Sequence, residues 1–157
     1  MEMVGALRQS AAFPRGRGRI STFAVGSGGK LLVTANSKST LHLWKADGTP
    51  ALLRAIDVPG TSIESVGLSP DEKQLLAIGH DKLAYVYEVE TGDEVRRLAG
   101  HDELLRGVGW SRDGKLLATS SADKTVKLWD AATGEERRSL AGPRVAPPGS
   151  SSGTSSR

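Results

Sequence analysis

A histidine, a hydroxyl residue and an aspartate follow one another in the second half of the chain, as the members of a hydrolase triad would. They are His101, Ser121 and Asp123, with Thr119 and Ser120 as neighbouring hydroxyls. In nucleophilic catalysis the histidine takes the proton of the hydroxyl, and the carboxylate orients the histidine. Such a set also needs a strained turn that presents the nucleophile and donors for the oxyanion. Because no such motif accompanies these residues, we expect no catalytic residue here and favour a structural role.

A glycine-rich turn, Gly26-Ser27-Gly28-Gly29-Lys30, is the nearest match to a phosphate-binding loop. A P-loop needs Ser or Thr after the lysine and a helix behind it. Here Leu31 follows the lysine and a strand pattern continues. The turn therefore predicts a hairpin and no nucleotide site.

Metal and cofactor chemistry has no support in the sequence. The chain has no cysteine, which excludes thiol catalysis and cysteine-ligated metals. His42 and His80 have no carboxylate or histidine partner at metal-ligand spacing. No apolar run approaches the roughly 18–20 residues of a membrane span. We therefore expect no cofactor, no metal and no membrane contact.

The elements that must position the polar residues are short strands. Segments rich in Val, Leu and Thr are separated by turn-forming clusters at residues 112–115 and 122–124. These connections are too short for a helix, so the pattern predicts an antiparallel β-meander. In the last segment Val126, Leu128 and Asp130 alternate with Lys127 and Trp129, as in a strand with two different faces.

The same unit recurs along the chain. Three aromatic residues and three lysines repeat at intervals of 42 or 43 residues: Trp44, Tyr87 and Trp129, and Lys30, Lys73 and Lys115. Apolar residues repeat in the same register, as in Phe23, Val66 and Val108. A period of about 40–45 residues with four short strands per unit is typical of a β-propeller.

The last unit resembles a WD repeat, because it opens with Gly100-His101 and closes with Trp129-Asp130. About three such repeats, the third the clearest, are similar to the WD-repeat (beta-transducin-like repeat) family over residues 19–140. The resemblance implies an all-β fold: a partial β-propeller of three four-stranded antiparallel WD-type blades, with disordered ends. It also implies a structural hydrogen-bond network of four residues, His101, Ser121, Asp123 and Trp129, with Thr119 and Ser120 as less favoured hydroxyls.

The first two units depart from this pattern. The second keeps Asp81 but has Pro59, Gly79 and Tyr87 where the histidine, hydroxyl and tryptophan are expected. The first has Asn36 at the hydroxyl position. We therefore expect these two units to be held mainly by apolar packing.

The repeats and the composition of the two ends divide the chain into three segments. We expect a flexible basic N-terminal segment at 1–18, the partial propeller at 19–140 with blades at about 19–58, 62–99 and 105–140, and a disordered Pro/Gly/Ser tail at 141–157. Propellers typically close with about four to eight blades. The sequence therefore predicts a fragment of a longer propeller, or a chain that completes its ring by self-association.

The resemblance implies a non-enzymatic protein–protein interaction scaffold that is intracellular, in the cytoplasm or the nucleus. Its partners would be other proteins or peptides on the blade-top loops, where Arg106 and His80 are the candidate contacts. An alternative is an RNA-associated component of a ribonucleoprotein or RNA-processing complex. The Arg-Gly run at residues 15–19 is its local support, since much of the basic excess lies at the chain ends. A further alternative is a propeller fragment of a larger enzyme.

Overall fold

The computed structural model describes residues 19–49, 51–60 and 62–142, and the regular structure in these ranges is entirely β-strand. Blade 1 contains β1 (Ile20–Val25), β2 (Leu31–Asn36), β3 (Thr40–Lys45) and β4 (Ala51–Asp57). Blade 2 contains β5 (Ile63–Leu68), β6 (Gln74–Gly79), β7 (Ala84–Glu88) and β8 (Glu94–Leu98). Blade 3 contains β9 (Leu105–Trp110), β10 (Leu116–Ser121), β11 (Thr125–Asp130) and β12 (Glu136–Ala141).

Each blade is an antiparallel meander whose strands pair in chain order. The prediction of an all-β fold with three four-stranded blades is therefore confirmed. The hairpins place a backbone with positive φ at the same turn of every blade, as in the series Gly48, Gly92 and Gly134 between the third and fourth strands. Glycine adopts this left-handed conformation without the steric cost of a Cβ.

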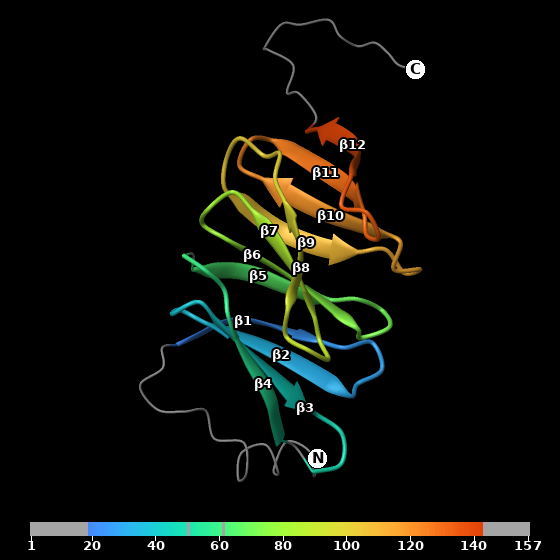
Figure 1. Ribbon diagram of the computed structural model, residues 1–157. Helices are drawn as coiled ribbons and strands as arrows, with labels where there is room; N and C mark the ends of the chain where they lie inside the picture. Colours follow the sequence, from blue (N-terminus) through green and yellow to red (C-terminus); the bar gives the residue numbers. More distant parts are fainter. Residues whose placement is uncertain (1–18, 50, 61, 143–157) are drawn as a thin grey trace, which may run out of the picture.

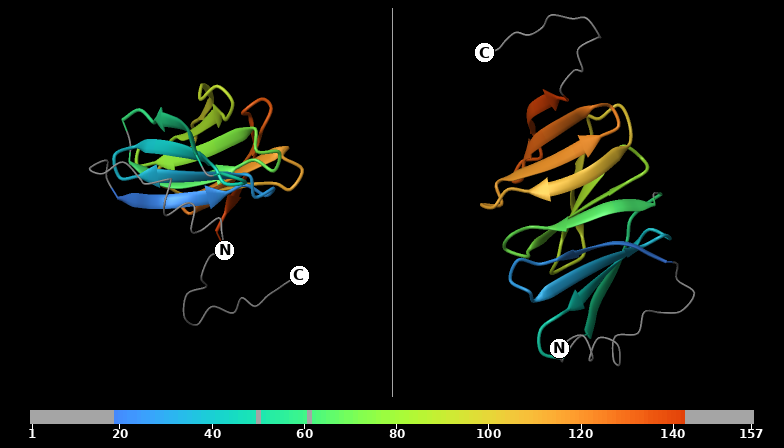
Figure 2. Two further views of the ribbon diagram at one scale, coloured as in Figure 1. Left: turned by 90° about the horizontal axis from the view of Figure 1, so that it is seen from below. Right: turned by 180° about the vertical axis from the view of Figure 1, so that it is seen from behind.

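The blades are stacked in chain order with blade 2 in the middle, as Figures 1 and 2 show. The first strands of the blades, β1, β5 and β9, pack side by side along one edge of the stack. We call the side that carries the turns between the second and third strands, together with the loops joining the blades, the upper face. The opposite side is the lower face.

Apolar side chains fill both spaces between blades. Leu41 and Leu43 of blade 1 pack with Leu75 and Tyr87 of blade 2 in one buried cluster. A second cluster joins the other face of blade 2 to blade 3. Because side chains of a strand alternate between its faces, each blade contributes one set of residues to each neighbour.

Several blade boundaries differ from the predicted ones by one residue. The largest consequence concerns the tail, which was expected to begin at residue 141. Ala141 instead pairs with Thr125 as the last residue of β12, and the Gly142 N–H donates to the Lys124 carbonyl. The strand extends because the backbone of β11 offers further ladder partners. The expected disordered segments at 1–18 and 143–157 lie outside the described residues.

Candidate functional site

A loop from blade 2 and the tight turn of blade 3 meet at the upper face. His101 comes from the loop and Asp123 from the turn between β10 and β11. His101 Nδ1 lies 2.8 Å from Asp123 Oδ2. The carboxylate also accepts hydrogen bonds from the backbone N–H groups of Asp102 at 3.1 Å and Thr125 at 2.9 Å. Because an ionised carboxylate only accepts, His101 presents an N–H at Nδ1.

Thr119 on β10 links this histidine to Trp129 on β11. Its hydroxyl oxygen lies 2.8 Å from His101 Nε2 and accepts a hydrogen bond of 2.9 Å from Trp129 Nε1. In the neutral imidazole with its proton on Nδ1, Nε2 accepts, so the Thr119 hydroxyl donates to it. Thr119 is 1% exposed and Trp129 3% exposed. The bonds therefore pair polar groups that have left water, and they fix the register of blade 3.

The hydroxyl in this network belongs to Thr119, so the expectation of Ser121 at this place is wrong. Ser121 donates to the Glu103 carbonyl at 3.0 Å and accepts from the Asp123 N–H at 3.1 Å. The pairing of β10 with β9 shifts between Ser120 and Ser121. This irregularity places Ser121 at the loop and the turn, while Thr119 faces the tryptophan.

Electrostatics favours the ionised form of Asp123. Burial raises the pKa of this carboxyl, but the hydrogen bonds from Thr125, His101 and Asp102 outweigh burial and hold the pKa well below its ordinary value. The hydroxyl that would have to act as nucleophile is enclosed between the imidazole and the indole. Because Thr119 is 1% exposed, its hydroxyl is held inside this hydrogen-bond network, and we call the set His101, Asp123, Thr119 and Trp129 the lock.

Blades 1 and 2 keep parts of this lock. In blade 1, Trp44 Nε1 donates to the Thr34 hydroxyl at 3.0 Å, as in the third blade. In blade 2, the Tyr85 hydroxyl donates to the Asp81 carboxylate. Burial and this bond raise the pKa of Tyr85. The expectation that apolar packing holds these two blades therefore leaves out the bond of Trp44 to Thr34 and the bond of Tyr85 to Asp81.

Arg106 and His80, the predicted contact residues, lie on the upper face on either side of one carboxylate. His80 Nε2 lies 3.0 Å from Glu64 Oε2, and Arg106 Nη1 lies 3.9 Å from Glu64 Oε1. The side chains of Arg106, His80 and Glu64 are 56%, 50% and 36% exposed. We call these three residues the upper patch. The sequence analysis did not single out Glu64. On β5 this residue occupies the repeat position that Arg106 occupies on β9.

The glycine-rich turn of blade 1 receives an acidic side chain from blade 2. The Glu72 carboxylate lies over Gly26, where a Cβ would meet Glu72 Oε1 at 1.6 Å, and it also lies beside Gly28. A phosphate at this turn would face a carboxylate of the same charge sign. The geometry thus agrees with a hairpin and gives no cradle for an anion.

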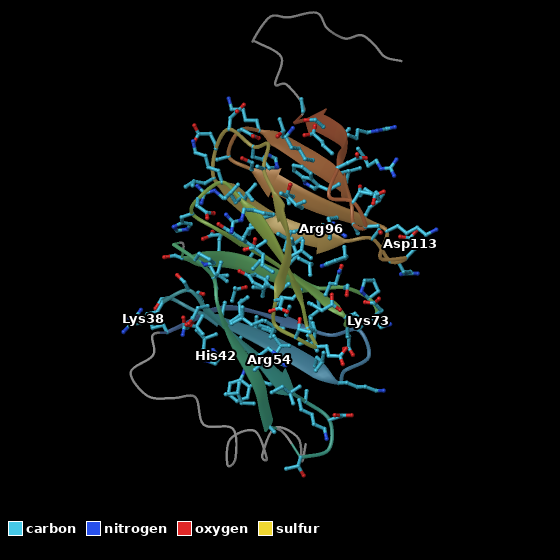
Figure 3. All side chains as sticks on the ribbon, viewed as in Figure 1. Lys38, His42, Arg54, Lys73, Arg96 and Asp113 are labelled. Carbon is cyan, nitrogen blue, oxygen red and sulfur yellow. The ribbon has the colours of Figure 1, made fainter. Side chains whose placement is uncertain are left out.

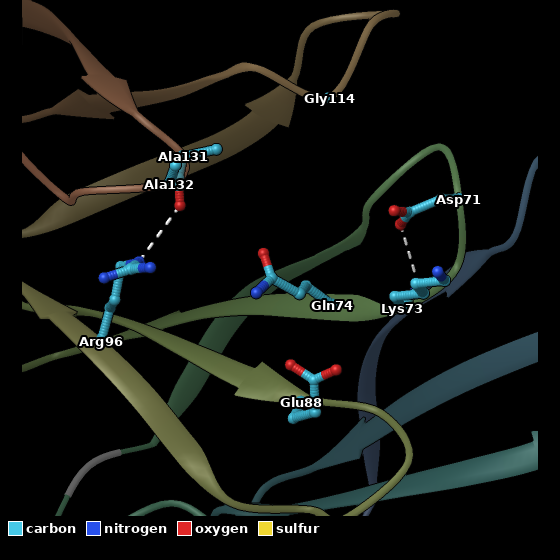
Figure 4. Close-up of a pocket in the computed structure, with 8 residues that line it drawn as sticks. All are labelled: Asp71, Lys73, Gln74, Glu88, Arg96, Gly114, Ala131 and Ala132. Carbon is cyan, nitrogen blue, oxygen red and sulfur yellow. Dashed lines mark hydrogen bonds between the residues drawn. The ribbon is translucent and has the colours of Figure 1, made fainter.

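A polar pocket of about 300 Å³ lies on the lower face between blades 2 and 3 (Figure 4). Arg96 spans its rim and donates from Nε to the Ala131 carbonyl at 3.1 Å. Asp71, Lys73 and Glu88 also line it, so positive and negative groups alternate around the space. This mixed lining gives neither a cation nor an anion a consistent set of partners.

Among the described residues, no three His, Asp or Glu side chains gather in a way that could hold a metal ion. The described ranges also contain no helix that is long and apolar enough to cross a membrane.

Comparison with known proteins identifies the clearest repeat. Residues 92–130 match the family model described as WD domain, G-beta repeat. The matched segment contains β8 of blade 2 and β9, β10 and β11 of blade 3. One sequence repeat therefore joins two neighbouring blades, which explains why the His101 loop of the repeat reaches into the next sheet.

The chain is also similar to Nuclear distribution protein nudF of Aspergillus niger, with 32% identity over 75 residues. The similar region is 48% of this chain and 17% of that relative, so the chain corresponds to a minor part of the relative's length. Residues 92–130 are therefore similar to a WD repeat, and the three four-stranded meanders agree with a fold of WD-type blades.

Proposed function

We propose that the chain is a non-enzymatic interaction scaffold that holds a peptide or protein on the upper patch. The observation that carries the proposal is the convergence of Arg106 and His80 on Glu64. The three side chains come from two neighbouring blades and are exposed, so a partner that lies across the first strands contacts all of them.

The geometry of the patch favours a partner that presents a carboxylate. Arg106 is held only loosely by Glu64, with 3.9 Å between the charged atoms, and its side chain is 56% exposed. A guanidinium has five N–H donors in a planar fork that matches a carboxylate. Donors of Arg106 that do not face Glu64 can therefore pair with an acidic side chain or a chain terminus.

A displayed library of random peptides, selected against the immobilised full chain, tests this function. We expect the enriched peptides to carry Asp or Glu and to bind the Arg106→Ala variant about tenfold more weakly, which corresponds to about 1.4 kcal/mol. The matched control is Arg112→Ala, because Arg112 is an exposed arginine of the same blade on the lower face. Equal binding to both variants would remove the upper patch from the proposal.

RNA association and a role within a larger enzyme are alternative proposals. RNA association rests on residues 15–19, of which only Arg19 lies within the described residues. No particular residue of the described ranges supports a role as a propeller fragment of a larger enzyme. We propose an intracellular location, in the cytoplasm or the nucleus, from the family alone.

A further inference from the structure

We infer that the polar pocket of the lower face binds a small zwitterion of the amino-acid class, with its carboxylate at Arg96 and its ammonium group at Glu88. The pocket lies between blades 2 and 3, on the face opposite the upper patch, so the inference is independent of the proposed peptide binding. We call it the lower pocket. Its polar side chains are Asp71, Lys73, Gln74, Glu88 and Arg96, and Gly114 belongs to its wall.

An arginine that is fixed in place forms one end of the lower pocket. Arg96 on β8 reaches into blade 3, where its Nε donates to the Ala131 carbonyl at 3.1 Å. Its aliphatic part packs over Gly134, where a Cβ would lie 3.3 Å from Arg96 Cδ. Arg54 of blade 1 reaches the Glu90 carbonyl of blade 2 in the same way (Figure 3). Because a guanidinium has five N–H donors in a planar fork, the donors of Arg96 on its two Nη atoms suit a carboxylate.

Two side chains of blade 2 form the floor of the pocket. Gln74 on β6 and Glu88 on β7 are directly opposite in the ladder, so their side chains leave the sheet on the same face. Figure 4 shows the Gln74 amide between Arg96 and Asp71, with the Glu88 carboxylate next to it. An amide both donates and accepts, so Gln74 suits either end of a ligand that carries both charges.

The other two charges of the pocket compensate each other. Asp71 Oδ1 accepts from the Ser69 hydroxyl at 2.6 Å and from the Lys73 N–H at 3.0 Å. These bonds, together with the charge of Lys73, hold the pKa of Asp71 below its ordinary value, so this carboxylate stays ionised beside the ammonium group. Arg96 and Glu88 are therefore the charges that the pocket offers to a ligand.

The junction of blades 1 and 2 shows the same space filled by the protein itself. Gly114 stands at the repeat position of Glu72, and both residues have a positive φ, of 74° and 58°. The Glu72 carboxylate lies beside Gly28, whose Cβ would be 3.4 Å from Glu72 Oε2. Gly28 stands at the repeat position of Asp71, which lines the lower pocket. Because Gly114 has no side chain, the corresponding space between blades 2 and 3 stays open.

The charges at each junction indicate what occupant it suits. At the repeat positions of Glu88 and Arg96, blade 1 has Lys45 and Arg54, which are two cations. The side chain that enters this first junction, Glu72, is an anion. In the lower pocket one of the two cations is replaced by a carboxylate. Its occupant therefore needs a cationic group as well as a carboxylate, which is the chemistry of a zwitterion.

The size of the lower pocket limits the ligand to a small one. Its volume is about 300 Å³, which is at the lower end of the range of about 300–1,000 Å³ that is usual for ligand sites. A single amino acid, whose two charged groups are close together, suits this space and the two charges at its ends.

An NMR titration of the isotope-labelled full chain with L-alanine tests the inference. We expect saturable shifts at the backbone N–H groups of Gly114 and Ala132, with an affinity in the millimolar range because the ligand has few heavy atoms. N-acetyl-L-alanine lacks the ammonium group and L-alaninamide lacks the carboxylate, so each should bind about tenfold more weakly or worse. The absence of saturable shifts with L-alanine, or equal binding of the three compounds, would overturn the inference.

Glu88→Gln tests the residue assigned to the ammonium group. The variant keeps the size of the side chain and removes its charge, so L-alanine should bind about tenfold more weakly while N-acetyl-L-alanine binds as before. The matched control is Glu90→Gln, because Glu90 is an exposed glutamate two residues further along that does not line the pocket. An equal affinity for L-alanine in the two variants would contradict the assignment.

Gly114→Glu tests the pocket without removing any of its charged side chains. Glu72 shows that a glutamate adopts the positive φ of this turn, and a Cβ at Gly114 would meet Pro70 at an ordinary contact of 3.7 Å. We expect the variant to be folded by circular dichroism and to show no saturable shift with L-alanine, because its new side chain enters the space. Binding as strong as in the wild type would place the ligand elsewhere.

Discussion

Blade 3 and blade 2 each bury an aromatic residue on the third strand, but with different polar partners. In blade 3 the buried indole of Trp129 has a hydroxyl partner, and that hydroxyl belongs to a chain of bonds through His101 to Asp123. In blade 2 the corresponding aromatic residue is Tyr87, and Ala77 replaces the hydroxyl. The Tyr87 hydroxyl is buried and has no hydrogen-bond partner among the described residues.

The difference goes with the place of each blade in the stack. Blade 2 is covered on both sides by neighbours, with Leu75 and Leu76 both 0% exposed. Blade 3 has one open side and a lock on its covered side. We infer that apolar burial from two sides compensates for the incomplete network in the middle blade.

Removal of the hydroxyl of Thr119 should have the largest effect on this comparison. Thr119→Val leaves Trp129 Nε1 and His101 Nε2 buried without partners, and each lost partner costs about 1–3 kcal/mol. We expect the free energy of unfolding to fall by about 3 kcal/mol in a urea titration. The matched control, Thr34→Val, removes the same group from a single bond with Trp44 and should cost about half as much.

The second largest effect should be a fall in the free energy of unfolding at acid pH, caused by Asp123 of blade 3. The pKa of Asp123 is lower in the folded chain than its ordinary value, so the unfolded chain binds this proton first as the pH falls. Its contribution to stability is complete above about pH 4 and is lost as the pH falls further, with a limiting slope of about 1.4 kcal/mol per pH unit. Urea midpoints measured at successive pH values show this slope. Asp123→Asn should flatten it, and an unchanged slope would contradict the role of Asp123.

The bond between Tyr85 and Asp81 should matter less than the lock of blade 3. Tyr85→Phe removes a hydrogen bond to a carboxylate that keeps the Leu83 N–H as a partner at 3.3 Å. We expect a loss of about 1–2 kcal/mol in the free energy of unfolding. A loss as large as that of Thr119→Val would mean that blade 2 has a polar lock of equal weight.

The smallest effect should have the opposite sign. Burial is the main reason that the pKa of Tyr87 is raised to about 12, and its hydroxyl has no hydrogen-bond partner in the part of the chain that the structure describes. Tyr87→Phe removes the unpaired group while the ring stays in the apolar cluster, so we expect a gain of about 0.5–1 kcal/mol. Destabilisation in the same urea titration would show that the hydroxyl is paired in solution.

Much of the fold could be predicted because the repeat is visible in single residues. The interval between Trp44, Tyr87 and Trp129 sets the number of blades, and turn residues separate the strands. The choice between Thr119 and Ser121 could not be predicted in the same way. Both lie on the same strand two positions apart, and a register shift near Ser121 decides between them.

Contacts between blades were the least accessible to sequence reasoning. Glu64 and Arg106 are far apart in sequence and meet because β5 and β9 are neighbours. Opposite charges at one repeat register of adjacent blades are a signal that could have found this pair. The contact of Glu72 with Gly26 depends on the stacking distance of two turns, which no pattern in the sequence specifies.

Hydrogen exchange of the indole N–H groups tests most directly the claim that polar locking is concentrated in blade 3. The chain has three tryptophans. Trp129 donates into the network of four residues, Trp44 donates to Thr34 at 3.0 Å, and Trp110 makes a long bond of 3.4 Å. By NMR under native conditions, Trp129 should exchange most slowly, Trp44 next and Trp110 fastest. Exchange at Trp129 as fast as at Trp44 would contradict the claim.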